Sequence, residues 1–150
     1  MYEQVNPKLD LLTYRAGIIE TLLRDMAFSI SQTLEKPDEA NVHDLRRLVL
    51  RLRHAVRVFG PLLPSRQARK VRRRLQALQD LLGQVRVCDV ALATIQQPEI
   101  ASASSKLETK KVAAAVTAAR RREMRPLRAG LRKLQQSEAV GRWRARLIAS

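Results

Sequence analysis

The sequence predicts an all-α protein, a four-helix bundle of long antiparallel helices followed by a short C-terminal helix. Leu, Ala, Arg and Gln are abundant, while the 150 residues include only five Gly and six Pro, a composition that favours helices. Apolar residues recur at helical spacing over long segments, and the alternation typical of strands is not sustained. A chain of this length is expected to form one domain, residues 1–150, with its own core.

The first helix is expected over residues 7–34. Asn6 and Pro7 are typical of a helix start, an N-cap followed by proline in the first turn. Apolar residues then recur every three or four positions as far as Leu34. Pro37 ends the pattern, because proline cannot continue the helix.

The second and third helices are separated by a short turn. The second is expected over residues 41–59, capped by Asn41 or Asp38. The sequence GPLLP follows, and a glycine with two prolines predicts a turn. The third helix is expected over residues 65–96, with Ser65 as its cap.

The fourth helix begins after the loop QQPEIASASS. Ser105 and Glu108 match the S-x-x-E capping box, in which two side chains satisfy backbone amides reciprocally. Pro126 lacks the amide hydrogen that would bond four residues back, so an interruption or kink is predicted there. Ser137 is expected to cap a short terminal helix that ends near Ile148.

The distribution of charge is the strongest functional signal in the sequence. The formal net charge is +15 at pH 7. Residues 42–86 contain twelve Lys/Arg and two Asp/Glu, and residues 120–150 contain ten Lys/Arg and two Asp/Glu. By contrast, residues 1–41 contain four Lys/Arg and seven Asp/Glu, and residues 87–119 contain three of each kind. Two segments concentrate the positive charge, and a polyanionic partner would relieve their self-repulsion.

Residues 41–59, NVHDLRRLVLRLRHAVRVF, carry positive charge on one side of the predicted helix. At about 100° per residue the apolar residues share one side, and basic residues occupy the other with only Leu50 among them. Arg51 lies at the edge of the basic side, whose members are His43, Arg46, Arg47, Arg51, Arg53, His54 and Arg57. An ordinary solvated face usually mixes signs, because like-charge neighbours cost ~0.2–0.5 kcal/mol each, so this pattern favours a binding surface.

Two further basic rows are expected. The row near the start of the third helix consists of Arg66, Arg69, Lys70 and Arg73. The row in the fourth helix, continuous if that helix passes Pro126, consists of Arg121, Arg125, Arg128 and Arg132. Arginine exceeds lysine by 22 to 7, which suits bidentate contacts to phosphate.

The aromatic residues help to distinguish between polyanions. Phe28 and Phe59 fall at expected core positions, and Tyr2, Tyr14 and Trp143 do not interleave with the basic rows. Nucleic-acid-binding proteins usually add stacking aromatics or a recognition helix, so the composition favours a plain phosphate polymer. A sequence-independent nucleic-acid-binding protein and a scaffold that docks on an acidic protein remain as alternatives.

Catalysis and metal binding find little support in the sequence. His43 and His54 would lie about 16 Å apart along one helix, too far to bind one metal ion. No nucleophile motif, phosphate-binding glycine loop or paired carboxylates occur, so no enzyme, cofactor or metal site is predicted. The single cysteine, Cys88, is expected in the core, and Arg86 and Asp89 are expected to form an intrahelical ion pair.

A cytoplasmic location without membrane insertion is also expected. One cysteine cannot form an intramolecular disulfide, so a reducing compartment is the default. The N-terminus shows no basic-then-apolar signal pattern, and no apolar run approaches the ~18 residues of a membrane span.

Two segments resemble the signatures of the CHAD family, the conserved-histidine α-helical domains. The first family pattern is V-H-x-L-R-x-x-x-R-R-L-R-x-x-L-R-x-F; Leu50 departs from it, and the residues that match include His43, Arg46, Arg51, Leu52, Arg53, Arg57 and Phe59. The second pattern is L-G-x-x-R-D-x-D-V; Val87 replaces its first aspartate, and the matching residues are Leu82, Gly83, Arg86, Asp89 and Val90. The resemblance is specific over residues 20–95.

The resemblance implies an all-helical domain that binds inorganic polyphosphate through basic surfaces, in some members at polyphosphate granules. The residues expected to contact polyphosphate are His43, Arg46, Arg47, Arg51, Arg53, His54, Arg57, Arg69, Lys70, Arg73, Arg121, Arg125 and Arg128. Typical members contain two similar helical halves, and this chain corresponds to one half. A homodimer that rebuilds the full surface is therefore expected, with a reduced single-copy form as the alternative.

Overall fold

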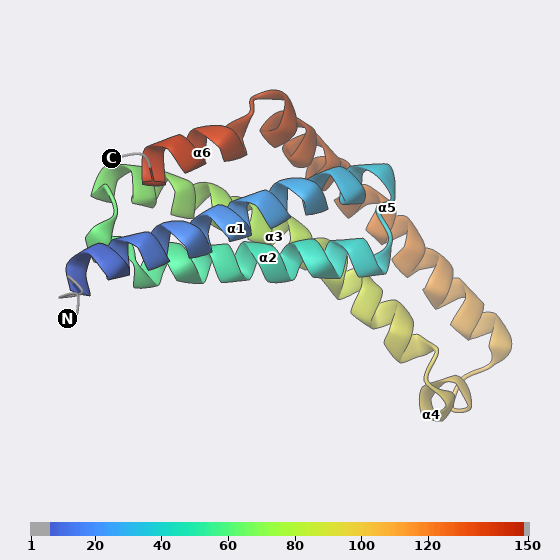
Figure 1. Cartoon of the computed structure of the whole chain (residues 1–150). Coiled ribbons are helices and arrows are strands. Elements are labelled where there is room, and N and C mark those ends of the chain that lie inside the picture. The colour runs from blue at the N-terminus through green and yellow to red at the C-terminus, as the bar shows by residue number, and fades with distance from the viewer. Residues whose placement is uncertain (1–6, 149–150) are drawn as a thin grey trace.

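The computed structural model describes residues 7–148, which are almost entirely helical (Figure 1). The elements are α1 (Pro7–Glu35), α2 (Glu39–Val58), the 3₁₀-helix η1 (Gly60–Leu62), α3 (Ser65–Ile95), α4 (Pro98–Ala101), α5 (Lys106–Gln136) and α6 (Ala139–Ile148). The four long helices α1, α2, α3 and α5 run alternately in opposite directions, and α6 follows α5 towards the end of the bundle where α1 begins. The all-α fold class is confirmed.

One hydrophobic core joins the helices. α2 packs on α1 and α3, while α5 and α6 pack on α3 and α1. The fully buried large side chains, spaced three, four or seven residues apart where a helix carries more than one, are Ile19, Leu23, Met26, Val42, Leu45, Val49, Leu52, Leu75, Leu82, Leu127, Leu131 and Leu147. Burying each contributes about 1.5–3 kcal/mol, so packing of these stripes fixes the arrangement of the helices.

The junction between α1 and α2 shows which of the two expected caps is used. Asp38 Oδ1 accepts a hydrogen bond from the backbone N–H of Asn41 at 2.9 Å, so Asp38 is the N-cap. Asn41 lies inside α2, and its side chain donates to the carbonyl of Lys36 at 2.7 Å. Asn6, the expected cap of α1, lies outside the described residues.

Replacing the cap, Asp38→Ala, is expected to lower the melting temperature by a few degrees at neutral pH. The bond from the Asn41 amide lowers the pKa of the Asp38 carboxyl below its ordinary 3.8. A depressed folded-state pKa contributes stability above the unfolded-state value, and that stability is lost as the pH falls through the folded-state value. Thermal melts from pH 7 to pH 2 should therefore show the difference between wild type and Asp38→Ala shrinking in acid. Asp38→Asn, which keeps the cap without the charge, is the control.

α5 is one continuous helix, so of the two outcomes predicted at Pro126 the interruption is wrong, while the kink stays a prediction. Pro126 and Arg122 both lie on the exposed side of α5, where water can bond the carbonyl that proline leaves without an amide partner. Met124, Leu127 and Leu131 are buried on both sides of the proline. Their packing against the core offsets the lost hydrogen bond and keeps the helix intact.

The remaining helix ends match the predictions in part. The capping box is confirmed, because the Glu108 N–H donates to Ser105 Oγ at 3.1 Å and the Glu108 side chain accepts from the Ser105 amide. Ser65 makes no cap bond and is the first residue of α3, so its expected role is wrong. Ser137 ends α5 instead of capping α6, and Glu138, with φ of 51°, separates the two helices. The expected loop before α5 contains the short helix α4.

Two predictions about aromatic and ionic side chains need correction. Phe28, expected in the core, is 66% exposed, whereas Phe59 packs on the core as expected. The expected pair of Arg86 with Asp89 does not form. Arg86 instead contacts Glu39 at the start of α2, at 3.1 Å, and buried Asp89 binds Arg120 of α5.

Candidate functional site

The basic side of α2 points away from the core. We call this surface the α2 face; its members are His43, Arg46, Arg47, Arg51, Arg53, His54 and Arg57. His43, Arg46 and Arg53 are half-buried, and the other four are exposed. The opposite side of α2 is buried against α1 and α3. The division of this helix into an apolar side and a basic side is confirmed, while the binding role of the seven residues stays a prediction.

The α2 face borders a groove of about 550 Å³ between α2 and α3. Its lining residues are Arg46, Gln79, Asp80, Gly83, Gln84, Arg86, Val87 and Val90. Arg53 lies next to it and donates from Nη1 to Gln79 Oε1 at 2.7 Å. A Cβ built on Gly83 would meet no atom within 4 Å, so packing does not require glycine there and its small size leaves the groove open. The two signature segments therefore meet at this groove.

Two nitrogen atoms of the α2 face are buried without a hydrogen-bond partner in the protein, His43 Nδ1 and Arg46 Nε. The two residues are three positions apart and therefore neighbours on the helix surface. Buried polar atoms normally have a partner. A guanidinium and an imidazole in this position can both donate to phosphate oxygens, the imidazole from whichever nitrogen carries the proton.

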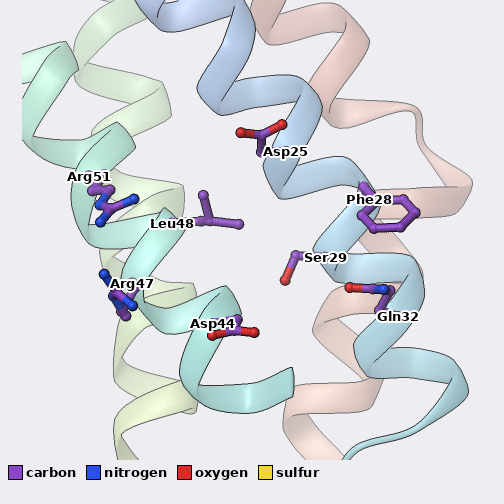
Figure 2. A pocket seen from close by; sticks show the side chains of 8 residues that line it. All are labelled: Asp25, Phe28, Ser29, Gln32, Asp44, Arg47, Leu48 and Arg51. Carbon is purple, nitrogen blue, oxygen red and sulfur yellow. The ribbon is translucent and has the colours of Figure 1, made fainter. Parts of the chain in front are cut away.

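On its other side the α2 face borders a groove of about 300 Å³ between α2 and α1 (Figure 2). Arg47 and Arg51 line it from α2, and Phe28 lies across it on α1. Asp25 of α1 and Asp44 of α2 also line this groove. The two carboxylates partly offset the two arginines, so this groove has a mixed charge.

Lys70 and Arg73 face α6 and not the α2 face. They line a groove of about 360 Å³ whose cationic side chains, which we call the α3–α6 cluster, are Lys70, Arg73, Arg74, Arg142 and Arg146. No carboxylate lines this groove among the described residues. Three members, Arg74, Arg142 and Arg146, were missed by the sequence analysis. The i,i+4 spacing of the last two beside an apolar tryptophan was the available signal.

The other predicted basic residues occupy separate surfaces. Arg69 is exposed and lines neither of the two grooves beside α3. Arg121 and Arg125 are exposed on α5, and Arg128 is half-buried with its Nε buried and without a partner. Because α5 is continuous, Arg121, Arg125 and Arg128 form one unbroken row, which we call the α5 row. It contributes no residue to the grooves described above beside α2.

The ion pairs of the described residues leave every predicted site residue unpaired. The four pairs are Lys36–Asp38, Arg86–Glu39, Arg120–Asp89 and Arg144–Glu20. Each joins a cation outside the predicted set to a carboxylate. Three of these pairs join different helices, and the fourth lies in the link between α1 and α2. The cations of the α2 face, Lys70 and Arg73 of the α3–α6 cluster, and the α5 row have no carboxylate partner among the described residues.

Residues 7–148 present neither a metal-binding cluster nor a membrane-spanning helix. No group of three or more His, Cys, Asp or Glu side chains there is arranged to hold a metal ion. No helix within these residues is long and apolar enough to cross a bilayer. Cys88 is a buried free thiol, in agreement with its expected core position.

Comparison with known proteins identifies a family. No curated protein and no solved structure matches this chain. The family model of the CHAD domain matches residues 17–150, and so extends well beyond the two signature segments. CHAD domains are in general binding domains associated with polyphosphate. With both signatures meeting at one groove and the match covering nearly the whole sequence, this chain belongs to the CHAD family.

Proposed function

We propose that this protein binds inorganic polyphosphate on the α2 face and in the adjoining α2–α3 groove, without catalysing its turnover. One observation carries the proposal: none of the seven residues of the α2 face forms an ion pair, although 14 carboxylates are present in the chain. Like-charge neighbours at i,i+4 are destabilising by a few tenths of a kcal/mol, and the face includes two such pairs, Arg47–Arg51 and Arg53–Arg57. A polyanion relieves that repulsion.

The shape of the α2 face suits a linear polymer of phosphates. From His43 to Arg57 it extends about 21 Å along one helix, so successive guanidinium groups can bind successive phosphates. Arg53 is held by Gln79, which orients its remaining donors. Guanidinium donors bind phosphate oxygens in pairs, which gives these contacts geometry as well as charge. The α3–α6 cluster and the α5 row would bind further segments of a long polymer.

A non-catalytic role is supported by two carboxylates of α3 that are engaged within the protein, while Asp25 and Asp44 on the α1 side belong to no metal-binding group among residues 7–148. Asp89 is buried against Arg120, and Asp80 accepts a hydrogen bond from Gln76 at 2.8 Å. Hydrolysis of phosphate polymers normally needs carboxylates that hold metal ions. Binding alone is therefore the proposed activity. A protein with this binding activity would be located in the cytoplasm, at polyphosphate granules where these form.

A second candidate function, sequence-independent binding of nucleic acid, is favoured by two exposed aromatic rings. Phe28 is 66% exposed beside Arg47 and Arg51, and Tyr14 is 63% exposed in a groove that Arg51 also lines. Aromatic rings next to basic residues can stack on bases while the cations bind the backbone. Polyphosphate has no base and would gain nothing from these rings.

Titration with long-chain polyphosphate and with single-stranded RNA, at matched phosphate concentration and ~0.15 M salt, distinguishes the two candidates. We expect polyphosphate to bind at least about tenfold more tightly, since all seven donors of the face can reach phosphate. Phe28→Ala should leave the affinity for polyphosphate unchanged. If RNA binds as tightly as polyphosphate and Phe28→Ala weakens RNA binding, nucleic-acid binding replaces polyphosphate binding as the proposed function.

A further inference from the structure

The C-terminal part of α3 and the N-terminal part of α5 extend beyond α1 and α2 as a two-helix hairpin with α4 at its tip (Figure 1). We call residues 87–119 the hairpin. No side chain from Val90 to Glu123 is buried. Eighteen of the 33 hairpin residues are apolar, nine of them alanine. Five larger apolar side chains are 41–65% exposed: Val87, Val90, Ile100, Leu107 and Val112. The hairpin therefore presents large apolar side chains to solvent, as interaction surfaces do.

Apolar side chains of the hairpin continue the stripes that form the bundle core. On α5, Val112 and Val116 extend at helical spacing the stripe to which buried Met124 and Leu127 belong. On α3, Leu92 does the same for Val85. In the bundle these stripes are buried, whereas in the hairpin the pairing of α3 with α5 covers them only in part. Val116 and Leu92 are half-buried, and Val112 is 48% exposed.

The charge of the hairpin indicates what covers it. With three Lys/Arg and three Asp/Glu it is neutral, whereas the whole chain carries +15. Two copies that met through their basic surfaces would repel each other. The hairpin is the segment through which they can approach without that cost, and contact there leaves both α2 faces free. An acidic partner would instead be drawn to the basic surfaces.

The dimensions of the hairpin suit a modest dimer interface. The segment of α5 from Lys106 to Glu123 spans about 27 Å, and two packed helices are about 20 Å wide. One face of the hairpin therefore offers on the order of 500 Å², or about 1,000 Å² for two copies, at the lower limit for a specific interface. Two hairpins packed face to face would form a four-helix bundle.

We propose that the hairpin is a self-association surface, and that two copies of this chain pack their hairpins together about a twofold axis. The apolar stripes of the two copies then bury each other, as an isologous contact requires. This inference rests on the exposure, composition and charge of the hairpin and does not depend on what the α2 face binds.

Sedimentation equilibrium of the full chain across a concentration series, without any polyanion, tests the proposal. Wild type is expected to dimerise, and Val112→Glu should weaken association at least about tenfold because it places a charge in the apolar seam. Leu107→Glu is the matched control: Leu107 is 63% exposed on the same helix but points away from the stripe, so the dimer should persist. Circular dichroism checks that both variants fold.

Salt gives a second readout. Hairpin association should strengthen as salt screens the repulsion between the two basic subunits, whereas polyphosphate binding should weaken. A chain that stays monomeric at every concentration and salt level overturns the proposal. A dimer that Val112→Glu and Leu107→Glu leave equally unaffected also overturns it, because association then uses another surface. Neither result bears on the titration of the α2 face, so the two proposals fail separately.

Discussion

Reversing two charges on the α2 face, Arg46→Glu together with Arg57→Glu, is expected to weaken polyphosphate binding about a hundredfold or more. A hydrogen bond to a charged group contributes about 1.5–3 kcal/mol, so loss of two such contacts amounts to about 3 kcal/mol even before the new repulsion is counted. Arg46 borders the α2–α3 groove, and Arg57 is exposed at the far end of the face. The two substitutions therefore lie near opposite ends of the α2 face. Titration at ~0.15 M salt measures the effect.

The matched control for this experiment is Lys110→Glu with Lys111→Glu. Both lysines are exposed near the start of α5, and the double change removes the same net charge. Beyond the Debye length of about 8 Å the effect of exposed charges is largely screened, so the control should lose only a few-fold. Because no substituted residue belongs to the core, circular dichroism should show unchanged helicity in both variants. Equal losses would mean that only overall charge matters, and unchanged affinity in the first variant would exclude the α2 face.

The helix positions could be read from the sequence largely because their ends carry strong local signals. The Ser105–Glu108 box acts through side chains a few residues from the amides they bond, so the pattern locates it, and for α2 the pattern narrowed the cap to Asp38 or Asn41. Pro126 does not interrupt α5 because its local cost is offset by long-range packing, which a local pattern does not report. Phe28 was misjudged on residue type: it lies about 180° from Ile19 on the helical wheel, opposite the α1 core stripe.

The site could be read from the sequence only one helix at a time. Periodicity showed which side of α2 is basic, because that side depends only on the spacing of residues within the helix. It did not show that Lys70 and Arg73 would join Arg142 and Arg146, because that grouping depends on where α6 packs. Likewise Arg86 and Asp89 match an intrahelical pair in spacing, yet each finds its partner on another helix. Tertiary packing sorts charges that look equivalent in sequence.

The second signature segment thereby has two parts with different roles. Its glycine and its arginine line the groove beside the α2 face, while its aspartate points into the protein. Asp89 is 5% exposed, and its Oδ1 accepts from Arg120 Nε at 2.6 Å. Arg120 also donates to the carbonyl of Pro37, at 3.0 Å, in the link between α1 and α2. One buried ion pair thus joins three parts of the chain where the hairpin leaves the bundle.

Asp89→Asn is therefore expected to lower the free energy of unfolding by about 3 kcal/mol, the low end of the cost of breaking a buried pair. We take the low end of that range because the Arg120 side chain is 21% exposed and can reach water. For a chain of this size the loss corresponds to a decrease of about 6–12 °C in Tm. Glu39→Gln, which breaks the exposed Arg86 pair of the same segment, is the control and should cost under about 1 kcal/mol.

A double variant separates the loss of the pair from the loss of packing. Asp89→Leu with Arg120→Leu removes both charges, and replacing a buried ion pair by apolar residues is often nearly neutral. Urea unfolding should then show the double variant more stable than Asp89→Asn, because the penalty in the single variant comes from leaving Arg120 charged opposite an amide. If the double variant is at least as unstable as the single one, Arg120 stabilises the protein mainly through its bond to the Pro37 carbonyl, which the double variant also removes. If Asp89→Asn costs no more than Glu39→Gln, the pair does not anchor the hairpin, and the hairpin's position must depend on the core stripe further along α5.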